Sequence, residues 1–315
     1  MLLNLAVGGN FVEQVESGVV PAEMEVDWVR VWQVDEVKAL PPEPSYPIVD
    51  GGGLEVNQLV TLSQPSDSHW TNFNFSDLYS ESPVVIPSVL TTNDGEPAVV
   101  GLSNITSMGM DVQIDEWDYL DGEHGSEDVG FLMLEPGQHD LGGLQAEAGV
   151  VMGSGVYKSI QFEEPFLSQP IVLAHVVNEK GDTASTVRVR NVGLNGFTIG
   201  LQQQELSGAF ALSEPREIHY IALEQGDGLY NGRDVRVGLT GSLVSHVPYE
   251  LSFGANVTDS VFYAQDQSTN GGDTSSLRIS ELSNESVLLS VVEEQSKDLE
   301  LVHNTERVGW VVLGR

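Results

Sequence analysis

Short apolar segments separated by polar turns make up most of the chain. Turn signals such as Gly181-Asp182, Asn195-Gly196 and Gly272-Asp273 follow most of them. No segment needs a helix longer than two turns. The pattern predicts an all-β fold of short antiparallel strands. In the best-defined stretch, the expected strands are 157–162, 171–177, 186–192, 196–202, 217–223 and 235–240.

An internal repeat accounts for residues 54–315. Phe75 stands eight positions before Pro83, and Phe162 stands eight positions before Pro170. Three segments ending in Leu134, Leu223 and Leu313 also match one another. Each unit spans about 75–90 residues, which is too long for a solenoid repeat and suits a small β-sandwich.

The first 53 residues do not belong to this repeat. Residues 24–34 form a period-2 strand in which Val26, Trp28 and Trp32 share one face. One strand and its short neighbour cannot form a core alone, so this segment needs a partner. Residues 35–53 hold three prolines in Pro41–Pro44, then Pro47, and end in three glycines, which predicts a linker.

Charge limits the choice of partners. The chain carries 13 Lys and Arg against 47 Asp and Glu, for a formal net charge of −34. Such a surface disfavours nucleic acid and anionic membranes. It also disfavours sulfated and uronate polysaccharides, unless a local basic patch overrides the field. Adaptation to high salt explains the same composition, because salt screens self-repulsion. The chain has no cysteine, which excludes disulfides and thiol chemistry.

The N-terminal segment resembles the C-terminal end of family 16 glycoside hydrolases, the laminarinase and β-glucanase group. The resemblance rests on residues 2–11, Leu-Leu-Asn-Leu-Ala-Val-Gly-Gly-Asn-Phe, and on 21–33, Pro-Ala-Glu-Met-Glu-Val-Asp-Trp-Val-Arg-Val-Trp-Gln. It implies a β-jelly-roll remnant of a secreted or cell-surface enzyme. The family's Glu-x-Asp-x-x-Glu motif is absent, so no activity is expected from this chain. The resemblance also implies that Asp27 helps hold a structural calcium; the alternative is an ordinary strand-end carboxylate.

The repeats resemble the H-type lectin fold, a six-stranded β-sandwich. The resemblance rests on the Phe-x(7)-Pro-Val-Val opening, on residues 188–199 and on the ending at 309–314. Gly101 stands where the second and third units have Arg188 and Arg278. Since H-type lectins commonly form trimers, three tandem units could form a pseudo-trimer within one chain.

Five segments follow from these patterns, and the fold class is an all-β jelly-roll remnant followed by three tandem antiparallel β-sandwiches. The expected segments are 1–34 (jelly-roll strands), 35–53 (linker), 54–153, 154–245 and 246–315 (three sandwich repeats).

Sugar recognition uses aromatic faces flanked by polar groups. Trp117, Tyr119 and Asp121 lie in an acidic loop that the other units lack, so they are candidate carbohydrate contacts; packing over the end of a sandwich is the alternative. Arg188 and Arg278 are candidates by resemblance to H-type lectins, with an intrachain ion pair as the favoured alternative.

The sequence therefore predicts a carbohydrate-binding tail that tethers a family 16 endo-β-glycanase to a neutral polysaccharide. A β-1,3-glucan is the preferred ligand, and galactans remain open. The alternative is a spacer or protein-interaction module without glycan binding. No cofactor is expected apart from a structural calcium, since Asp94, Asp182 and Asp273 lie in ordinary turns without a spaced ligand series.

Overall fold

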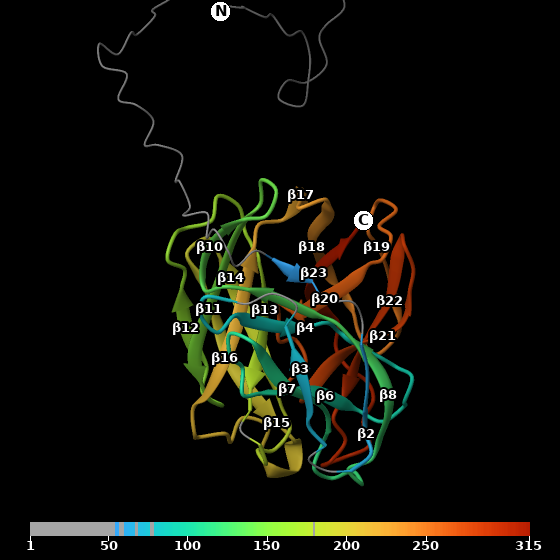
Figure 1. Ribbon diagram of the computed structural model, residues 1–315. Coiled ribbons are helices and arrows are strands. Elements are labelled where there is room, and N and C mark those ends of the chain that lie inside the picture. The colour runs from blue at the N-terminus through green and yellow to red at the C-terminus, as the bar shows by residue number, and fades with distance from the viewer. Residues whose placement is uncertain (1–53, 57–59, 67–68, 76–78, 179) are drawn as a thin grey trace, which may run out of the picture. The chain divides into compact units, whose positions relative to one another are not determined.

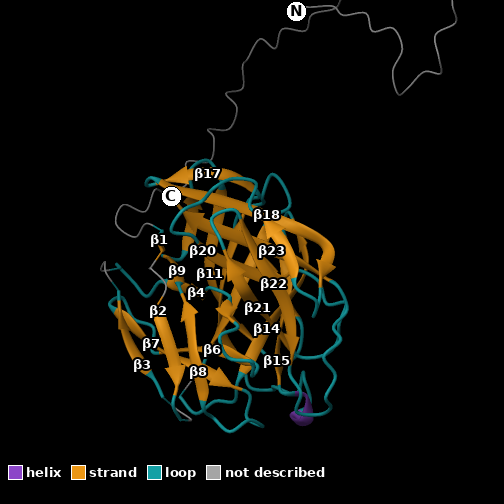
Figure 2. Cartoon of the chain, turned by 90° about the vertical axis from the view of Figure 1, so that its right-hand side faces the viewer, coloured by secondary structure: helices purple, strands orange, loops and turns teal. Residues whose placement is uncertain are grey.

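The computed structural model describes residues 54–56, 60–66, 69–75, 79–178 and 180–315 (Figure 1). The chain divides between Ser45 and Tyr46 into two parts, and the N-terminal part lies outside the described residues. The predicted strand 24–34 and Asp27 therefore lie outside them as well. The described part confirms the all-β prediction. Its one helical element is the 3-10 turn η1 (Glu205–Ser207), and everything else regular is strand (Figure 2).

Strand pairing sorts the described chain into three β-units, which we number in chain order. The first holds β1 (Glu55–Val56), β2 (Val60–Gln64), β3 (Thr71–Asn74), β4 (Val84–Pro87), β5 (Leu90–Thr91), β6 (Ala98–Ser103), β7 (Gly109–Glu116), β8 (His124–Val129) and β9 (Phe131–Leu134). The second holds β10 (Gly137–Asp140), β11 (Gln145–Gly153), β12 (Lys158–Gln161), β13 (Ile171–Val177), β14 (Ser185–Gly193), β15 (Gly196–Gln203) and β16 (Arg216–Leu223). The third holds β17 (Gly226–Tyr230), β18 (Arg233–Val244), β19 (Tyr249–Ser252), β20 (Val261–Asp266), β21 (Ser275–Leu282), β22 (Ser286–Glu293) and β23 (Glu306–Gly314). The six strands expected within 157–240 all occur.

Each unit contains two antiparallel layers with the same pairing order. The inner layer of the first unit is built from the pairs β2–β8, β1–β9 and β9–β4. The inner layers of the other two units are β11–β16–β13 and β18–β23–β20. The outer layers are β3–β7–β6, β12–β15–β14 and β19–β22–β21. The hairpin strands β10 and β17 extend the inner layers of the second and third units. Corresponding strands therefore take corresponding positions in all three units.

The inner strands are apolar on both faces because each face lines a different core. In β16, Ile218, Tyr220 and Ala222 pack into the core of the second unit. The alternate residues Ile221 and Leu223 pack into a further core shared by all three units. Successive side chains of a strand point to opposite faces. A strand that is buried on both faces therefore has apolar residues at successive positions instead of alternating apolar and polar ones. The first and third units have cores of their own beside the shared one.

The contacts between units run in a cycle. Strand β6 of the first unit meets β13 of the second, where Val177 pairs with Leu102. Strand β14 of the second unit meets β20 of the third, where Gln265 Nε2 donates to the Val187 carbonyl (3.0 Å). Strand β21 of the third unit meets β5 of the first, where Arg278 pairs with Leu90. Each unit thus presents corresponding strands to the next, and the third returns to the first.

The boundaries expected from the sequence differ from this grouping by one hairpin. The expected boundaries place residues up to 153 in the first unit, yet β11 pairs with β16 along its length. They place residues up to 245 in the second unit, yet β18 pairs with β23 of the third. The repeat recognisable in the sequence begins at Phe75 and Phe162, after the first inner strands of their units, so the expected boundaries leave β11 in the first segment and β18 in the second. The described residues contain no helix long and apolar enough to cross a membrane.

Candidate binding grooves between the units

Three surface grooves lie at corresponding places, one at each contact between units. Groove A, of about 440 Å³, joins Ser280–Asn284 of the third unit to Thr91 and Asp128 of the first. Groove B, of about 870 Å³, joins Ser103–Ile105 of the first unit to residues 211–217 of the second. Groove C, of about 380 Å³, joins Arg190–Val192 of the second unit to Gln267–Asn270 and Arg307 of the third. No single unit forms a complete groove.

The first wall of each groove is the same piece of the unit, where the strand β6, β14 or β21 ends. Asn104 and Asn191 occupy the corresponding position in grooves B and C, and both have left-handed backbones (φ 49° and 54°). The residue that follows each is a half-buried aliphatic, Ile105 or Val192. In groove A, Glu281 and Leu282 occupy these two positions at an irregularity in β21. Each wall therefore offers a polar group beside an apolar one.

The second wall differs in charge from groove to groove. Strands β8, β16 and β23 correspond, and they place Asp128, Glu217 and Arg307 at the same position of grooves A, B and C. The lining of groove A also includes Asp259, and that of groove B includes Arg216 with further acids. The described residues that line groove C include no carboxylate. Amide, hydroxyl, carboxylate and guanidinium groups are the donors and acceptors that polyol ligands use.

Two of the interfaces are held by buried arginines. The Arg278 guanidinium donates to the Glu127 carboxylate and to the carbonyl oxygens of Thr91, Asp94 and Glu96. Arg278 is 1% exposed. Burial alone would raise the pKa of Glu127, but hydrogen bonds from His124 and Thr91 outweigh it and the pKa is lowered. Arg278 therefore acts in this structure as an interface residue rather than as an accessible sugar contact.

Arg188 plays the corresponding part between the second and third units. Its guanidinium contacts Asp266 (3.3 Å) and Glu306 (3.2 Å), and Nη1 donates to Ser275 Oγ (2.9 Å). Arg188 is also 1% exposed, so the ion-pair alternative describes both predicted arginines. Burial would raise the pKa of Glu306, but hydrogen bonds from His303 and Ser268 hold it down to about 2.

The contact between the first and second units is built differently. Gly101 takes the place of the arginine, and Arg216 takes the place of the partner glutamate. Arg216 Nη1 donates to Ser185 Oγ (2.9 Å) and to the Thr183 carbonyl (3.0 Å), and its Nε lies 3.4 Å from Asp182. Both positions of the ion pair therefore differ here, and these partners of Arg216 belong to its own unit.

The loop that holds Trp117 packs against all three units. Trp117 is 1% exposed and clusters with Val99 and with Ala184 of the second unit. The Tyr119 hydroxyl accepts a hydrogen bond from the Gln295 backbone of the third unit (3.3 Å). Since a stacking platform needs an open ring face, the sugar contact expected of Trp117 does not fit this structure. Packing, the alternative from the sequence, describes Trp117.

Asp121 is exposed and belongs to an acidic group. Carboxylate oxygens of Glu96, Glu116 and Asp121 lie within 4.8 Å of one another. The two oxygens of Glu116 already accept hydrogen bonds, from His124 Nδ1 (3.1 Å) and the Gly122 backbone (3.1 Å). An acidic group on a surface is common without a metal, and nothing else around this one points to a cation. The calcium site expected at Asp27 lies outside the described residues.

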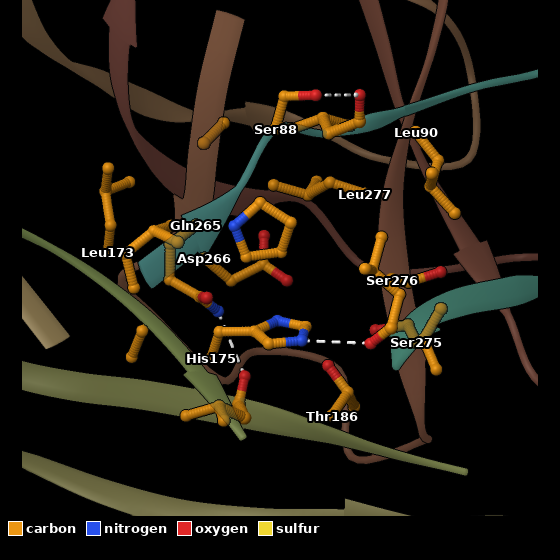
Figure 3. A pocket seen from close by; sticks show the side chains of 18 of the residues that line it. Ser88, Leu90, Leu173, His175, Thr186, Gln265, Asp266, Ser275, Ser276 and Leu277 are labelled. Atoms are coloured by element: carbon orange, nitrogen blue, oxygen red, sulfur yellow. Dashed lines mark hydrogen bonds between the residues drawn. The ribbon is translucent and has the colours of Figure 1, made fainter. Parts of the chain in front are cut away.

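A small cavity of about 90 Å³ lies where the three units meet (Figure 3). Corresponding residues Ser88, His175 and Gln265 line it, one from each unit. His175 Nε2 contacts the Val100 carbonyl (2.9 Å), and burial lowers the pKa of His175 to about 4, so the ring is neutral near pH 7. Asp266 Oδ1 is buried there without a hydrogen-bond partner in the part of the chain that the structure describes. Its size suits a few water molecules rather than a sugar.

Comparison with known proteins adds no identity, because no family model, no curated protein and no solved structure matches this chain. The resemblances to family 16 glycoside hydrolases and to H-type lectins stay predictions.

Proposed function

We propose that this chain is a multivalent carbohydrate-binding module whose sites are grooves A, B and C. The observation that carries the proposal is the recurrence of a groove at the same place in all three contacts between units. Core packing alone gives no reason for an open polar groove to recur at each contact. Each groove combines hydroxyl-binding groups with one aliphatic side chain, Leu282, Ile105 or Val192, that can lie against sugar C–H groups.

Neutral polysaccharides are the ligand class that grooves A and B favour. Their linings include Asp128, Asp259 and Glu281 in groove A, and Glu214 and Glu217 in groove B. Carboxylates accept hydrogen bonds from sugar hydroxyls and repel anionic substituents. A β-1,3-glucan or a neutral galactan meets both conditions. Because shallow grooves bind weakly one at a time, three on one chain raise affinity for a repeating polymer through effective concentration.

A tethering role for a family 16 endo-β-glycanase is the biological setting that we propose. Its support is the sequence resemblance of residues 1–34 to the end of that enzyme's jelly roll. A secreted or cell-surface location belongs to the same proposal. In this setting the module keeps the enzyme on its insoluble or dilute substrate.

The test is affinity electrophoresis of the full chain through gels that contain laminarin or agarose-type galactan. Asn104→Gly, Asn191→Gly and Glu281→Ala each remove the polar group at the corresponding position of one groove. Glycine fits the left-handed backbone of the two asparagines, so these changes remove an amide without strain. Asn231→Gly is the matched control, since Asn231 is also left-handed (φ 51°) and lies outside all three grooves.

We expect retardation of the unchanged chain and of the control, and loss of retardation in the triple variant. Each single change should weaken binding by about three- to tenfold, the value of one hydrogen bond. A triple variant that binds as well as the unchanged chain would show that the grooves are not the sites. Free migration of the unchanged chain in every gel would favour the spacer alternative.

A further inference from the structure

Groove C departs from the charge of the rest of the molecule. Among the described residues, its lining contains two arginines, Arg190 and Arg307, and no Asp or Glu. The whole chain has 13 Lys and Arg against 47 Asp and Glu. The corresponding position to Arg307 is acidic in the other two grooves, Asp128 in groove A and Glu217 in groove B. Two cations without an acid in one small groove therefore require a local explanation.

Arg190 is held in place by the second unit itself. Its guanidinium carbon lies 3.5 Å above the centre of the Tyr157 ring, a cation–π contact. Its Nε is buried without a hydrogen-bond partner within the described residues. Tyr157 also packs against Phe210, with ring centres 5.4 Å apart, which fixes the ring. Among the described residues, the lining of the groove offers no carboxylate beside the Arg190 charge.

Arg307 comes from the third unit and is exposed. Its backbone N–H donates to Ser268 Oγ (2.8 Å), which sets the chain at the edge of the groove. The nearby buried acids Glu306 and Asp266 both contact Arg188, and His303 contacts Glu306 as well. Those acids are therefore already compensated. Asn191 and Asn270 add amides to the same lining.

We propose that groove C binds an anionic substituent of a saccharide, a uronate carboxylate or a sulfate ester, through Arg190 and Arg307. The inference rests on the proposed function and adds a ligand class to one of its three sites. Guanidinium groups form forked, charge-assisted hydrogen bonds to both kinds of oxyanion. The negative field of the chain excludes anionic polymers elsewhere, so an anionic group can dock only where this patch overrides the field. Grooves A and B would then hold neutral residues of the same polymer.

The experiment measures binding of oligosaccharides to the full chain by isothermal titration calorimetry. The probes are a galacturonate hexasaccharide, a sulfated galactose oligosaccharide and the neutral laminarihexaose. Arg307→Ala removes the exposed cation, and Arg307→Lys keeps its charge without the fork. Arg315→Ala is the matched control, because Arg315 is an exposed arginine outside the lining of all three grooves.

We expect at least one anionic probe to bind, and Arg307→Ala to weaken it by about tenfold or more, with Arg307→Lys in between. Arg315→Ala and laminarihexaose binding should not change. Comparing the galacturonate and sulfated probes identifies which anion is used. Equal binding of an anionic probe by Arg307→Ala, or binding of laminarihexaose alone, would overturn the inference and leave the proposed function standing. Failure of every probe to bind would overturn the inference and exclude a β-1,3-glucan as the neutral ligand of the proposed function.

Discussion

Arg278 of the third unit and Glu127 of the first form an ion pair across the contact between units, and both side chains are nearly fully buried. Arg188 and Glu306 repeat this pair between the second and third units. Each glutamate also contacts a histidine from its own unit. Because a buried charge needs its partner, each pair makes the folding of one unit depend on its neighbour. The pairs fix the walls of grooves A and C relative to each other.

Arg278→Met should destabilise the protein by about 3–5 kcal/mol, because it removes the guanidinium that pairs with the buried Glu127 carboxylate. Combining it with Glu127→Gln should recover much of the loss, since the double variant has no unpaired buried charge. Urea unfolding followed by tryptophan fluorescence measures both. Lys297→Ala is the surface control, with an expected effect below about 1 kcal/mol, because this lysine is 60% exposed and 4.0 Å from Glu205. If the losses in free energy of unfolding caused by Arg278→Met and by Glu127→Gln simply add in the double variant, the two residues are not coupled.

The first unit should be sensitive to added volume at Gly101, where the other two units have the arginine. A Cβ at Gly101 would lie 2.8 Å from Gln113 Cγ and 3.3 Å from Trp70 Cη2. Gly101→Ala should therefore cost about 1–3 kcal/mol through overpacking. Gly272→Ala is the control, because a Cβ there meets nothing within 4 Å. Adding Gln113→Ala should relieve the closest contact and recover part of the loss in urea unfolding. An unchanged midpoint for Gly101→Ala alone would mean that Gln113 and Trp70 move aside freely.

The strands were predictable from the sequence because alternation and turn residues are local signals. The expected strand 171–177 matches β13 residue for residue. The grooves were not predictable, because they depend on which units touch, and contact between units leaves no period along the chain. The prediction of Trp117 as a sugar contact failed for a related reason. An aromatic residue in an acidic loop is expected to be exposed, whereas Trp117 packs against Ala184 of another unit. For Arg188 and Arg278 the sequence predicted an intrachain ion pair as the favoured alternative, but it named neither the partner acids nor the contact between units that the pairs cross.

Stability should be greatest in mildly acid solution, because the buried histidines prefer to be charged. Burial lowers the pKa of His124 and of His303, but hydrogen bonds to their glutamates outweigh burial and raise it overall. Their contribution is complete below the unfolded value of about 6.5 and is lost as pH rises through the higher folded pKa. The lowered pKa values of Glu127 and Glu306 act at the other end: their contribution is present above about 4.5 and is lost as pH falls.

Two further acids act in the same direction as the histidines. Burial raises the pKa of Asp266 to about 6 and that of Glu205 to about 7. Each contribution is complete below the unfolded value of about 4 and is lost as pH rises to the folded pKa. The midpoint of thermal unfolding should therefore be highest near pH 5 and fall by at least about 3 °C by pH 8. Substituting both histidines, His124→Gln with His303→Gln, should flatten the decline above pH 6.5; an unchanged slope would exclude them as its cause.

The three units should unfold together, because they share a core in addition to their own. Leu173 packs in the shared core, whereas Leu201 packs in the core of the second unit. We expect differential scanning calorimetry of the full chain to give one transition for residues 54–315. Leu173→Ala and Leu201→Ala should each lower that same transition, at a cost of about 2–5 kcal/mol. Independent units would respond differently: Leu201→Ala would split off an early transition of the second unit alone. Such a split would mean that the shared core and the buried arginines do not couple the units, and that the grooves between them open before the units unfold.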